Sequence, residues 1–139
     1  MYNNPAMEPR IQDAQGKVKY TRLYADDHGI SHFEELEFEL SEADIAPPAA
    51  PLNVSALFAV AQCLFASVPQ NWDGGWHPAP RRQFWIQIAG ELEVEAGDGE
   101  RRRFGPGSVV LLEDVSGKGH VTRVVGQGPA GGVFVQLRE

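Results

Sequence analysis

Short segments that alternate between apolar and polar residues, separated by turns rich in glycine and proline, fill the second half of the chain. The most specific of these turns is Asp98-Gly99, which lies between ELEVEA and RRRF. An Asp-Gly pair favours the two-residue turn of a β-hairpin, because glycine adopts the positive φ that such a turn needs. Four more segments have the length and composition of strands: RRQFWIQIA, SVVLLED, HVTRVV and GVFVQL. The pattern predicts an all-β fold, either a sandwich or a small barrel.

The first half of the sequence predicts longer strands joined by a proline-rich connection. One strand is expected from Lys17 to Ala25, and a second at SHFEELEFEL (31–40), where apolar and acidic residues alternate. The stretch IAPPAAPLN (45–53) is interpreted as an extended crossing between elements, because proline cannot donate a backbone hydrogen bond. The apolar residues 55–68 suit either a helix or one long buried strand, and their flanking prolines favour the strand.

The length and charge of the chain indicate one domain and restrict its partners. A chain of 139 residues builds a single core, so we expect a flexible arm at residues 1–15 and one domain at residues 16–139. The net charge is −7, from 12 Lys and Arg against 19 Asp and Glu. Nucleic acids and anionic membranes attract positive surfaces, so neither is expected as a partner. A small-molecule ligand is the better expectation.

The sequence also allows predictions about the cellular compartment of the protein and about its single thiol. No apolar run is long enough to span a bilayer, and the N-terminus lacks the pattern of a signal peptide, so a cytoplasmic protein is expected. Cys63 is the only cysteine, which excludes an intramolecular disulfide. Its apolar neighbours predict a buried, inert thiol.

Two stretches resemble the two motifs that define the cupin superfamily. In WHPAPRRQFWIQIAG, His77 matches the first histidine of the first motif, whereas Ala79 replaces its second histidine and Gln83 its glutamate. GSVVLLEDVSGKGHVTRV resembles the second motif, with His120 reached two residues late. The resemblance implies a double-stranded β-helix (cupin or jelly-roll) barrel, a homodimer, and a site inside the barrel.

Strand alternation suggests which side chains would accompany His77. On a regular strand, one face carries polar and aromatic residues, namely His77, Arg81, Gln83, Trp85 and Gln87. If this face lines a cavity, its amide and indole groups can orient an organic ligand. The opposite face carries Phe84, Ile86 and Ile88, which are expected to pack on another sheet or subunit.

The favoured function is an enzyme of the isomerase or lyase type that acts on a small polar organic substrate. His77 and His120 would transfer protons, since an unperturbed imidazole titrates near neutral pH. Arg81 or Arg123 would bind a substrate carboxylate, and Gln83 would polarise a carbonyl group.

Two alternatives remain open from the residues. In a metal-dependent oxygenase, His77, His120, Gln83 and Glu113 would hold iron or manganese, with Asp114 as another carboxylate candidate; nickel or zinc would fit such ligands as well. A cupin of this kind can also bind a ligand without catalysing a reaction, because a fold does not determine a function.

Overall fold

The computed structural model describes residue 12 and residues 16–139, and eleven β-strands form in this part of the chain. The strands are β1 (Lys19–Ala25), β2 (Ser31–Glu37), β3 (Ser41–Ala43), β4 (Leu52–Val54), β5 (Val60–Val68), β6 (Gln83–Ala89), β7 (Glu91–Glu95), β8 (Arg101–Phe104), β9 (Val109–Glu113), β10 (Val121–Val125) and β11 (Ala130–Leu137). The described residues form no helix, and so none that is long and apolar enough to cross a membrane. The predicted arm at residues 1–15 lies outside the described residues, apart from Gln12.

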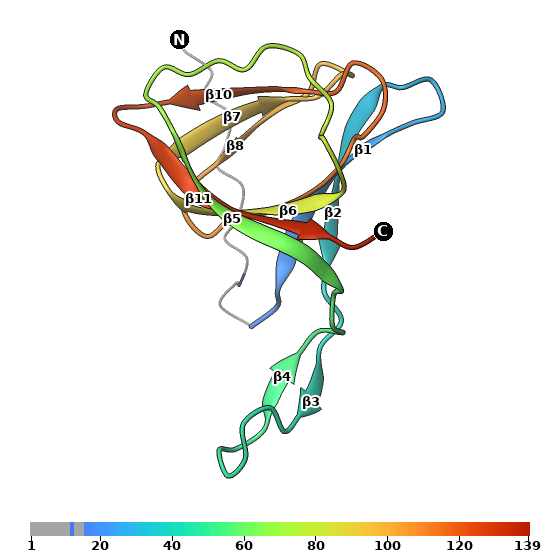
Figure 1. Ribbon diagram of the computed structural model, residues 1–139, viewed down its shortest axis with the longest axis vertical. Coiled ribbons are helices and arrows are strands. Elements are labelled where there is room, and N and C mark those ends of the chain that lie inside the picture. Colours follow the sequence, from blue (N-terminus) through green and yellow to red (C-terminus); the bar gives the residue numbers. More distant parts are fainter. Residues whose placement is uncertain (1–11, 13–15) are drawn as a thin grey trace.

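Two sheets form the body of the molecule (Figure 1). The larger has six strands in the order β2-β1-β9-β6-β11-β5, and the smaller has three in the order β10-β7-β8. Neighbouring strands are antiparallel, except that β1 and β9 are parallel. The all-β prediction is confirmed. The predicted closed barrel is not, because β2 and β5 are edge strands of the larger sheet among the described residues.

The main core lies between the two sheets. In the two facing sheets, alternate residues of a strand point inward, as the pleat of a strand requires. Trp85 and Leu112 of the larger sheet thus share one buried cluster with Leu92, Val94 and Phe104 of the smaller sheet. Burying large apolar side chains stabilises such a core by roughly 1.5–3 kcal/mol each.

A second cluster covers part of the outer face of the larger sheet. Phe84, which alternates with the inward residues of β6, packs there with Leu111 of β9 and Leu137 of β11. The rings of Phe38 and Phe58 cover Phe84, with centroids 6.2 and 5.1 Å from its ring. The residues just before β3 and β5 therefore fold back onto the sheet.

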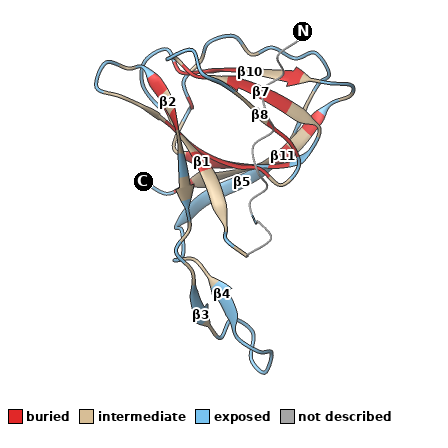
Figure 2. Ribbon diagram, turned by 180° about the vertical axis from the view of Figure 1, so that it is seen from behind, coloured by how far each residue is buried: buried red, intermediate tan, exposed pale blue. Residues whose placement is uncertain are grey.

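The proline-rich stretch at 45–53 is not a crossing between sheets. Strands β3 and β4 pair with each other from Ser41↔Val54 to Ala43↔Leu52, and the prolines occupy the loop between them. The resulting hairpin projects away from both sheets (Figures 1 and 2). The expectation failed because proline prevents regular pairing only within the loop, while the residues on either side of it pair normally.

The apolar segment 55–68 is a strand only from Val60 onward. Because β5 is an edge strand, most of its residues are exposed (Figure 2). Cys63 is therefore exposed, and the prediction of a buried thiol is wrong.

Candidate functional site

His77 and His120 lie side by side because two chain segments pair at this point. The backbone nitrogen of each histidine donates to the carbonyl oxygen of the other, both over 3.0 Å. The same pairing continues from Gly74 N to Thr122 O over 3.1 Å. The centroids of the two imidazole rings are 4.7 Å apart. Two histidines that are 43 positions apart in the sequence are thus held by backbone hydrogen bonds and not only by side-chain contacts.

Gly119 makes this close pairing possible. Its φ is +80°, and a Cβ atom there would lie 1.9 Å from the carbonyl oxygen of His77. No residue with a side chain fits this position without separating the two segments. The Gly-Lys-Gly loop just before His120 therefore has a structural role.

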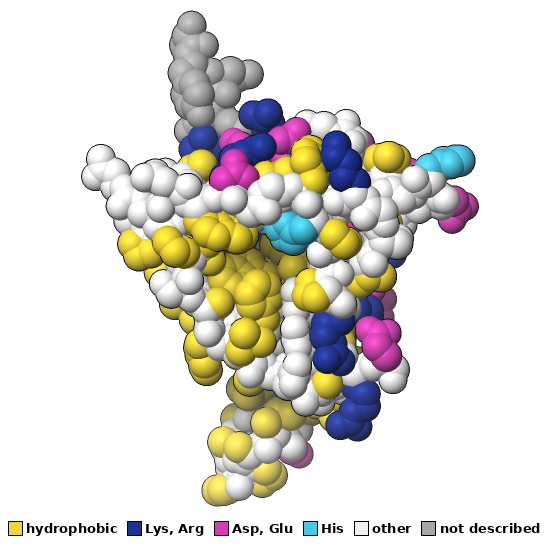
Figure 3. Space-filling view, turned by 45° about the horizontal axis from the view of Figure 1, so that its top comes forward, with side chains coloured by type: hydrophobic (Ala, Val, Ile, Leu, Met, Phe, Trp, Pro, Cys, Tyr) yellow, Lys and Arg dark blue, Asp and Glu magenta, His cyan; other side chains and the backbone are white. Residues whose placement is uncertain are grey.

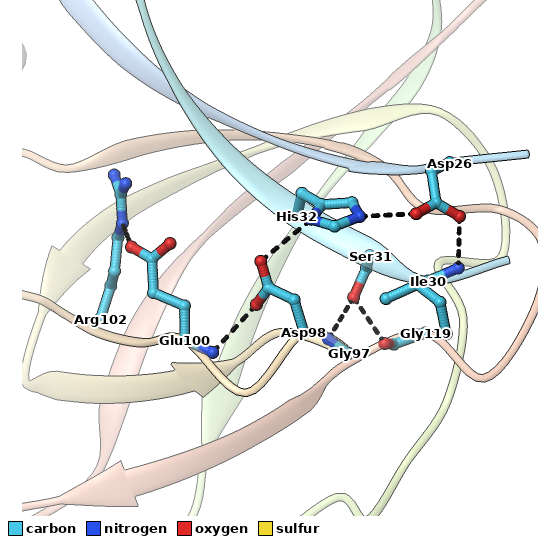
Figure 4. A network of polar contacts seen from close by, with 9 residues as sticks. All are labelled: Asp26, Ile30, Ser31, His32, Gly97, Asp98, Glu100, Arg102 and Gly119. Carbon is cyan, nitrogen blue, oxygen red and sulfur yellow. Dashed lines mark hydrogen bonds and ion pairs between the residues drawn. The ribbon is translucent and has the colours of Figure 1, made fainter. Parts of the chain in front are cut away.

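Ser31 anchors the same loop from the other side (Figure 4). Its hydroxyl donates to the carbonyl oxygen of Gly119 over 2.8 Å and accepts a hydrogen bond from the backbone nitrogen of Gly97 over 2.6 Å. Ser31 is fully buried, so these bonds are shielded from water. The loop that presents His120 is thereby attached to the first residue of β2 and to the β7–β8 turn.

Hydrogen bonds at Nδ1 set the orientation of both imidazole rings. Nδ1 of His120 lies 2.5 Å from Oδ2 of Asp114, and the two residues are 4% and 0% exposed. Nδ1 of His77 lies 2.8 Å from the carbonyl oxygen of Gly75. Since a carboxylate or carbonyl oxygen accepts, each ring donates through Nδ1, and in the neutral ring Nε2 is the atom that can accept a proton or bind a ligand.

Both histidines line a cavity of about 490 Å³ between the sheets. Its walls are mainly apolar and aromatic, with Leu64, Val68, Trp72, Trp85, Leu92, Val94, Phe104, Val110, Leu112 and Phe134. Polar groups come from Ser67, His77, Gln83, His120, Thr122 and Gln136. No Asp, Glu, Lys or Arg of the described chain is among the lining residues. In the space-filling view, hydrophobic side chains surround a hollow with a histidine at its rim (Figure 3).

Gln83 and Trp85 lie on the cavity wall, as strand alternation suggested. Oε1 of Gln83 accepts a hydrogen bond of 2.9 Å from Gln136, whose own Oε1 accepts one of 2.5 Å from Gln62. The indole nitrogen of Trp85 donates to Gln87 over 3.3 Å. The amide nitrogen of Gln87 donates in turn to the carbonyl oxygens of Gly90 and Phe104, over 2.9 and 3.0 Å, so Gln87 is a structural residue.

The two arginines considered at the sequence level do not reach the cavity. Arg81 donates to the carbonyl oxygen of Leu137 over 3.2 Å, and Arg123 forms ion pairs with Asp73 and Glu95. Neither arginine lines the cavity, so the expected carboxylate-binding group is not in place.

Glu113 faces away from the histidines because it alternates with Leu112, which points inward. It forms ion pairs with Arg22 and Arg82. Burial acts to raise the pKa of Glu113, but the hydrogen bonds from both arginines outweigh it and hold the pKa below its usual value. Its carboxylate is therefore fully engaged as an anion on the outer face.

The donor set at the site does not match a metal centre with two histidines and one carboxylate. Glu113 lies on the outer face, and Asp114 contacts His120 through Nδ1, which makes it an orienting residue. Among the described residues, no three His, Cys, Asp or Glu side chains form a group that could hold a metal ion. His77, His120 and Gln83 remain in the cavity wall as side chains whose nitrogen or oxygen atoms could bind a metal ion.

Comparisons with known proteins do not assign the chain to a family. No protein-family model matches the sequence, and no curated protein shows significant similarity to it. The site therefore has to be interpreted from its own geometry.

Sequence reasoning missed most of the apolar wall and the role of Asp114. Phe104, Thr122 and Phe134 reach the cavity from β8, β10 and β11. The alternation within RRRF and VFVQL was the available signal, but it does not say which face of a strand lies inside. The contact of Asp114 with His120 depends on how the loop between them folds, for which the sequence pattern offers no indication.

Proposed function

We propose that this chain binds an uncharged small organic molecule in the cavity between its sheets and moves a proton on it, as an isomerase or lyase does. The observation that carries the proposal is the pair of imidazoles in the wall of an apolar cavity, each oriented through Nδ1 so that Nε2 is available. With two such groups, one can remove a proton from one carbon while the other delivers a proton elsewhere on the substrate.

The roles of the two histidines follow from their partners. His120 acts as the base, because the imidazolium formed at Nε2 is stabilised by the Asp114 carboxylate at Nδ1. His77, when protonated, acts as the acid that returns a proton to the substrate. Exchange with water then restores both rings, so the substrate is isomerised with no net change in atoms or electrons. The amide NH₂ of Gln83 can donate to the substrate oxygen that becomes negative.

The chemistry of the cavity wall selects the class of ligand. A volume of about 490 Å³ lies within the usual range for small-molecule sites. A charged ligand would lose its hydration without gaining an ion pair, because the described lining residues carry no charged side chain. We therefore favour a mainly apolar carbonyl compound over the carboxylate that Arg81 or Arg123 was expected to bind.

We also propose that the fold is a jelly roll related to the cupins. The proposal is supported by two facing sheets and by the presence of both motif histidines in one cavity. It would be abandoned if an experimental structure placed the strands in a different topology.

A solvent-exchange experiment tests the function. The protein is incubated in D₂O with a panel of uncharged aliphatic, cyclic and aromatic ketones, and deuterium incorporation is followed by NMR. We expect catalysed exchange for at least one ketone, and a loss of about 100-fold or more in His120→Ala. His28→Ala is the control, since His28 is exposed and does not line the cavity. Exchange that survives in both His77→Ala and His120→Ala would disprove the assignment.

Binding measurements and elemental analysis of the same protein distinguish the alternatives. Binding without any exchange would indicate a ligand-binding protein. Near-stoichiometric iron, manganese, nickel or zinc that disappears in His77→Ala would indicate metal-dependent chemistry instead.

A further inference from the structure

The outer face of strands β5, β11 and β6 is apolar and exposed beyond the cluster around Phe84. Phe65 is 80% exposed, Ile88 is 57% exposed, and Ile86 and Cys63 are also exposed on this face. These three strands contain no charged residue, in a chain with 31 charged side chains. A surface without charge is typical of the centre of a protein interface.

The β3–β4 hairpin carries a second exposed apolar surface, which has no partner among the described residues. It projects away from the two sheets (Figures 1 and 2), and Ile45 and Leu52 in it are 57% and 55% exposed. A hairpin of two short strands is at best marginally stable in water when it packs on nothing. The hairpin therefore needs a surface to lie against, and its own sheets do not supply one.

The area of these surfaces is close to what a stable dimer needs. The exposed fractions of five side chains, Ile45, Leu52, Phe65, Ile86 and Ile88, correspond to about three fully exposed ones. At roughly 150 Å² each, the lower figure for a large side chain, they present on the order of 450 Å² of apolar surface. Each partner in a standard interface buries about 800 Å², which includes polar atoms as well.

We propose that a second copy of this chain covers this face, with the hairpin of each copy lying against the outer sheet face of the other. A twofold arrangement buries both unpartnered surfaces at once, because each copy supplies a hairpin and a face. The absence of charge on β5, β6 and β11 fits this partner, since two chains of net charge −7 repel each other wherever acidic groups meet. The interface also covers the edge strand β5, which would otherwise expose unpaired backbone groups.

Sedimentation equilibrium of the full chain at micromolar concentrations tests the proposal. We expect a dimer, which Phe65→Glu weakens by about 100-fold or more and Leu52→Glu weakens as well. Val115→Glu is the matched control, because Val115 is also apolar and 51% exposed but lies in the loop after β9. The thiol of Cys63 provides a second measurement: it should react slowly with an aromatic disulfide reagent in the dimer and rapidly in Phe65→Glu.

A monomer at tens of micromolar would overturn the proposal and leave the face to another occupant. A dimer that Phe65→Glu and Val115→Glu affect equally would overturn the location of the interface. Circular dichroism melting of each variant shows whether it is folded, and the replaced side chains are exposed, so folding should be retained.

Discussion

The positions of the two imidazoles depend on two residues that do not line the cavity. Asp114 holds His120 through Nδ1, and Gly119 allows the backbone of His120 to reach that of His77. Both requirements are geometric. A substitution at either position would change the position of the imidazoles without removing them.

Gly119→Ala should therefore destabilise the protein more than an ordinary glycine substitution. The positive φ costs about 1 kcal/mol for a residue with a Cβ. The clash with the carbonyl oxygen of His77 must also separate the two segments and weaken hydrogen bonds worth about 1 kcal/mol each. We expect a loss of about 3 kcal/mol in urea unfolding, together with loss of catalysed exchange.

The control for this prediction is Gly99→Ala. Gly99 has a φ of +93°, but a Cβ atom there would meet nothing within 4 Å. Its substitution should cost only about 1 kcal/mol. Equal losses for the two variants would mean that the close approach at Gly119 does not exist in solution.

At the scale of single residues, sequence patterns indicate which residues are candidates for a site better than they predict what those residues contact. His77 and His120 were singled out because their surroundings resemble two known motifs, and the structure brings both into one cavity. Glu113 and Asp114 were equivalent candidates in the sequence, yet one forms ion pairs on the outer face and the other contacts His120. Neighbouring residues in a strand point to opposite faces, and Asp114 lies just after the end of β9. The two carboxylates therefore contact different residues.

Among the secondary-structure elements, the β1–β2 and β7–β8 turns are joined by one histidine (Figure 4). His32 contacts Oδ2 of Asp26 through Nε2 over 2.7 Å and Oδ2 of Asp98 through Nδ1 over 3.0 Å. With both ring nitrogens beside carboxylates, the protonated ring makes the better bridge. Ser31, the neighbour of His32, is hydrogen-bonded both to the β7–β8 turn at Gly97 and to the loop before His120 at Gly119.

This bridge should make stability depend on pH. The hydrogen bond with Asp26 raises the pKa of His32, and the same bond lowers the pKa of Asp26 to about 2. The contribution of His32 to the free energy of unfolding is complete below its pKa in the unfolded chain, about 6.5. It is lost as the pH rises through the raised pKa of the folded state. The contribution of Asp26 is complete above about 3.8 and is lost as the pH falls through about 2.

Thermal unfolding from acidic to alkaline pH measures this effect. The difference in Tm between the wild type and His32→Gln should be largest between about pH 4 and 6.5 and should shrink at alkaline pH. The effect is small, since the three groups are partly exposed and screened by water. His28→Gln is the control, and a pH-independent difference for His32→Gln would contradict the bridge.

The elements also differ in how well the sequence predicted them. The hairpin at Asp98-Gly99 was predicted because its turn is local. The turn is longer than the two residues expected, because Ala96 N donates to Glu100 O across residues 97–99, and of these only Gly99 has a positive φ. The hairpin around the prolines at 45–53 was not predicted, because its strands are only three residues long and carry no alternation. The exposure of β5 could not be predicted either, since an edge strand differs from a central one only in its neighbours.

For the whole molecule, the cavity and the core share the space between the same two sheets. Leu112 belongs to the buried cluster and also lines the cavity, whereas Leu23 belongs to that cluster and does not line the cavity. If the cavity persists in solution, replacing Leu23 with alanine and replacing Leu112 with alanine should lower the free energy of unfolding by different amounts. The surroundings of Leu23 have to close around a new void, whereas the space left by Leu112 joins one that water already reaches.

We therefore expect Leu23→Ala to cost about 4 kcal/mol in urea unfolding and Leu112→Ala about 2 kcal/mol, the two ends of the usual range for such changes. The loss of catalysed exchange should be larger for Leu112→Ala than for Leu23→Ala. Leu112→Ala removes a contact with the bound ligand, whereas Leu23→Ala removes none. If Leu112→Ala costs as much as Leu23→Ala and the wild type catalyses no exchange, the two sheets close on each other in solution. The histidine pair would then face a packed core with no room for a substrate, and the proposed reaction would have no site.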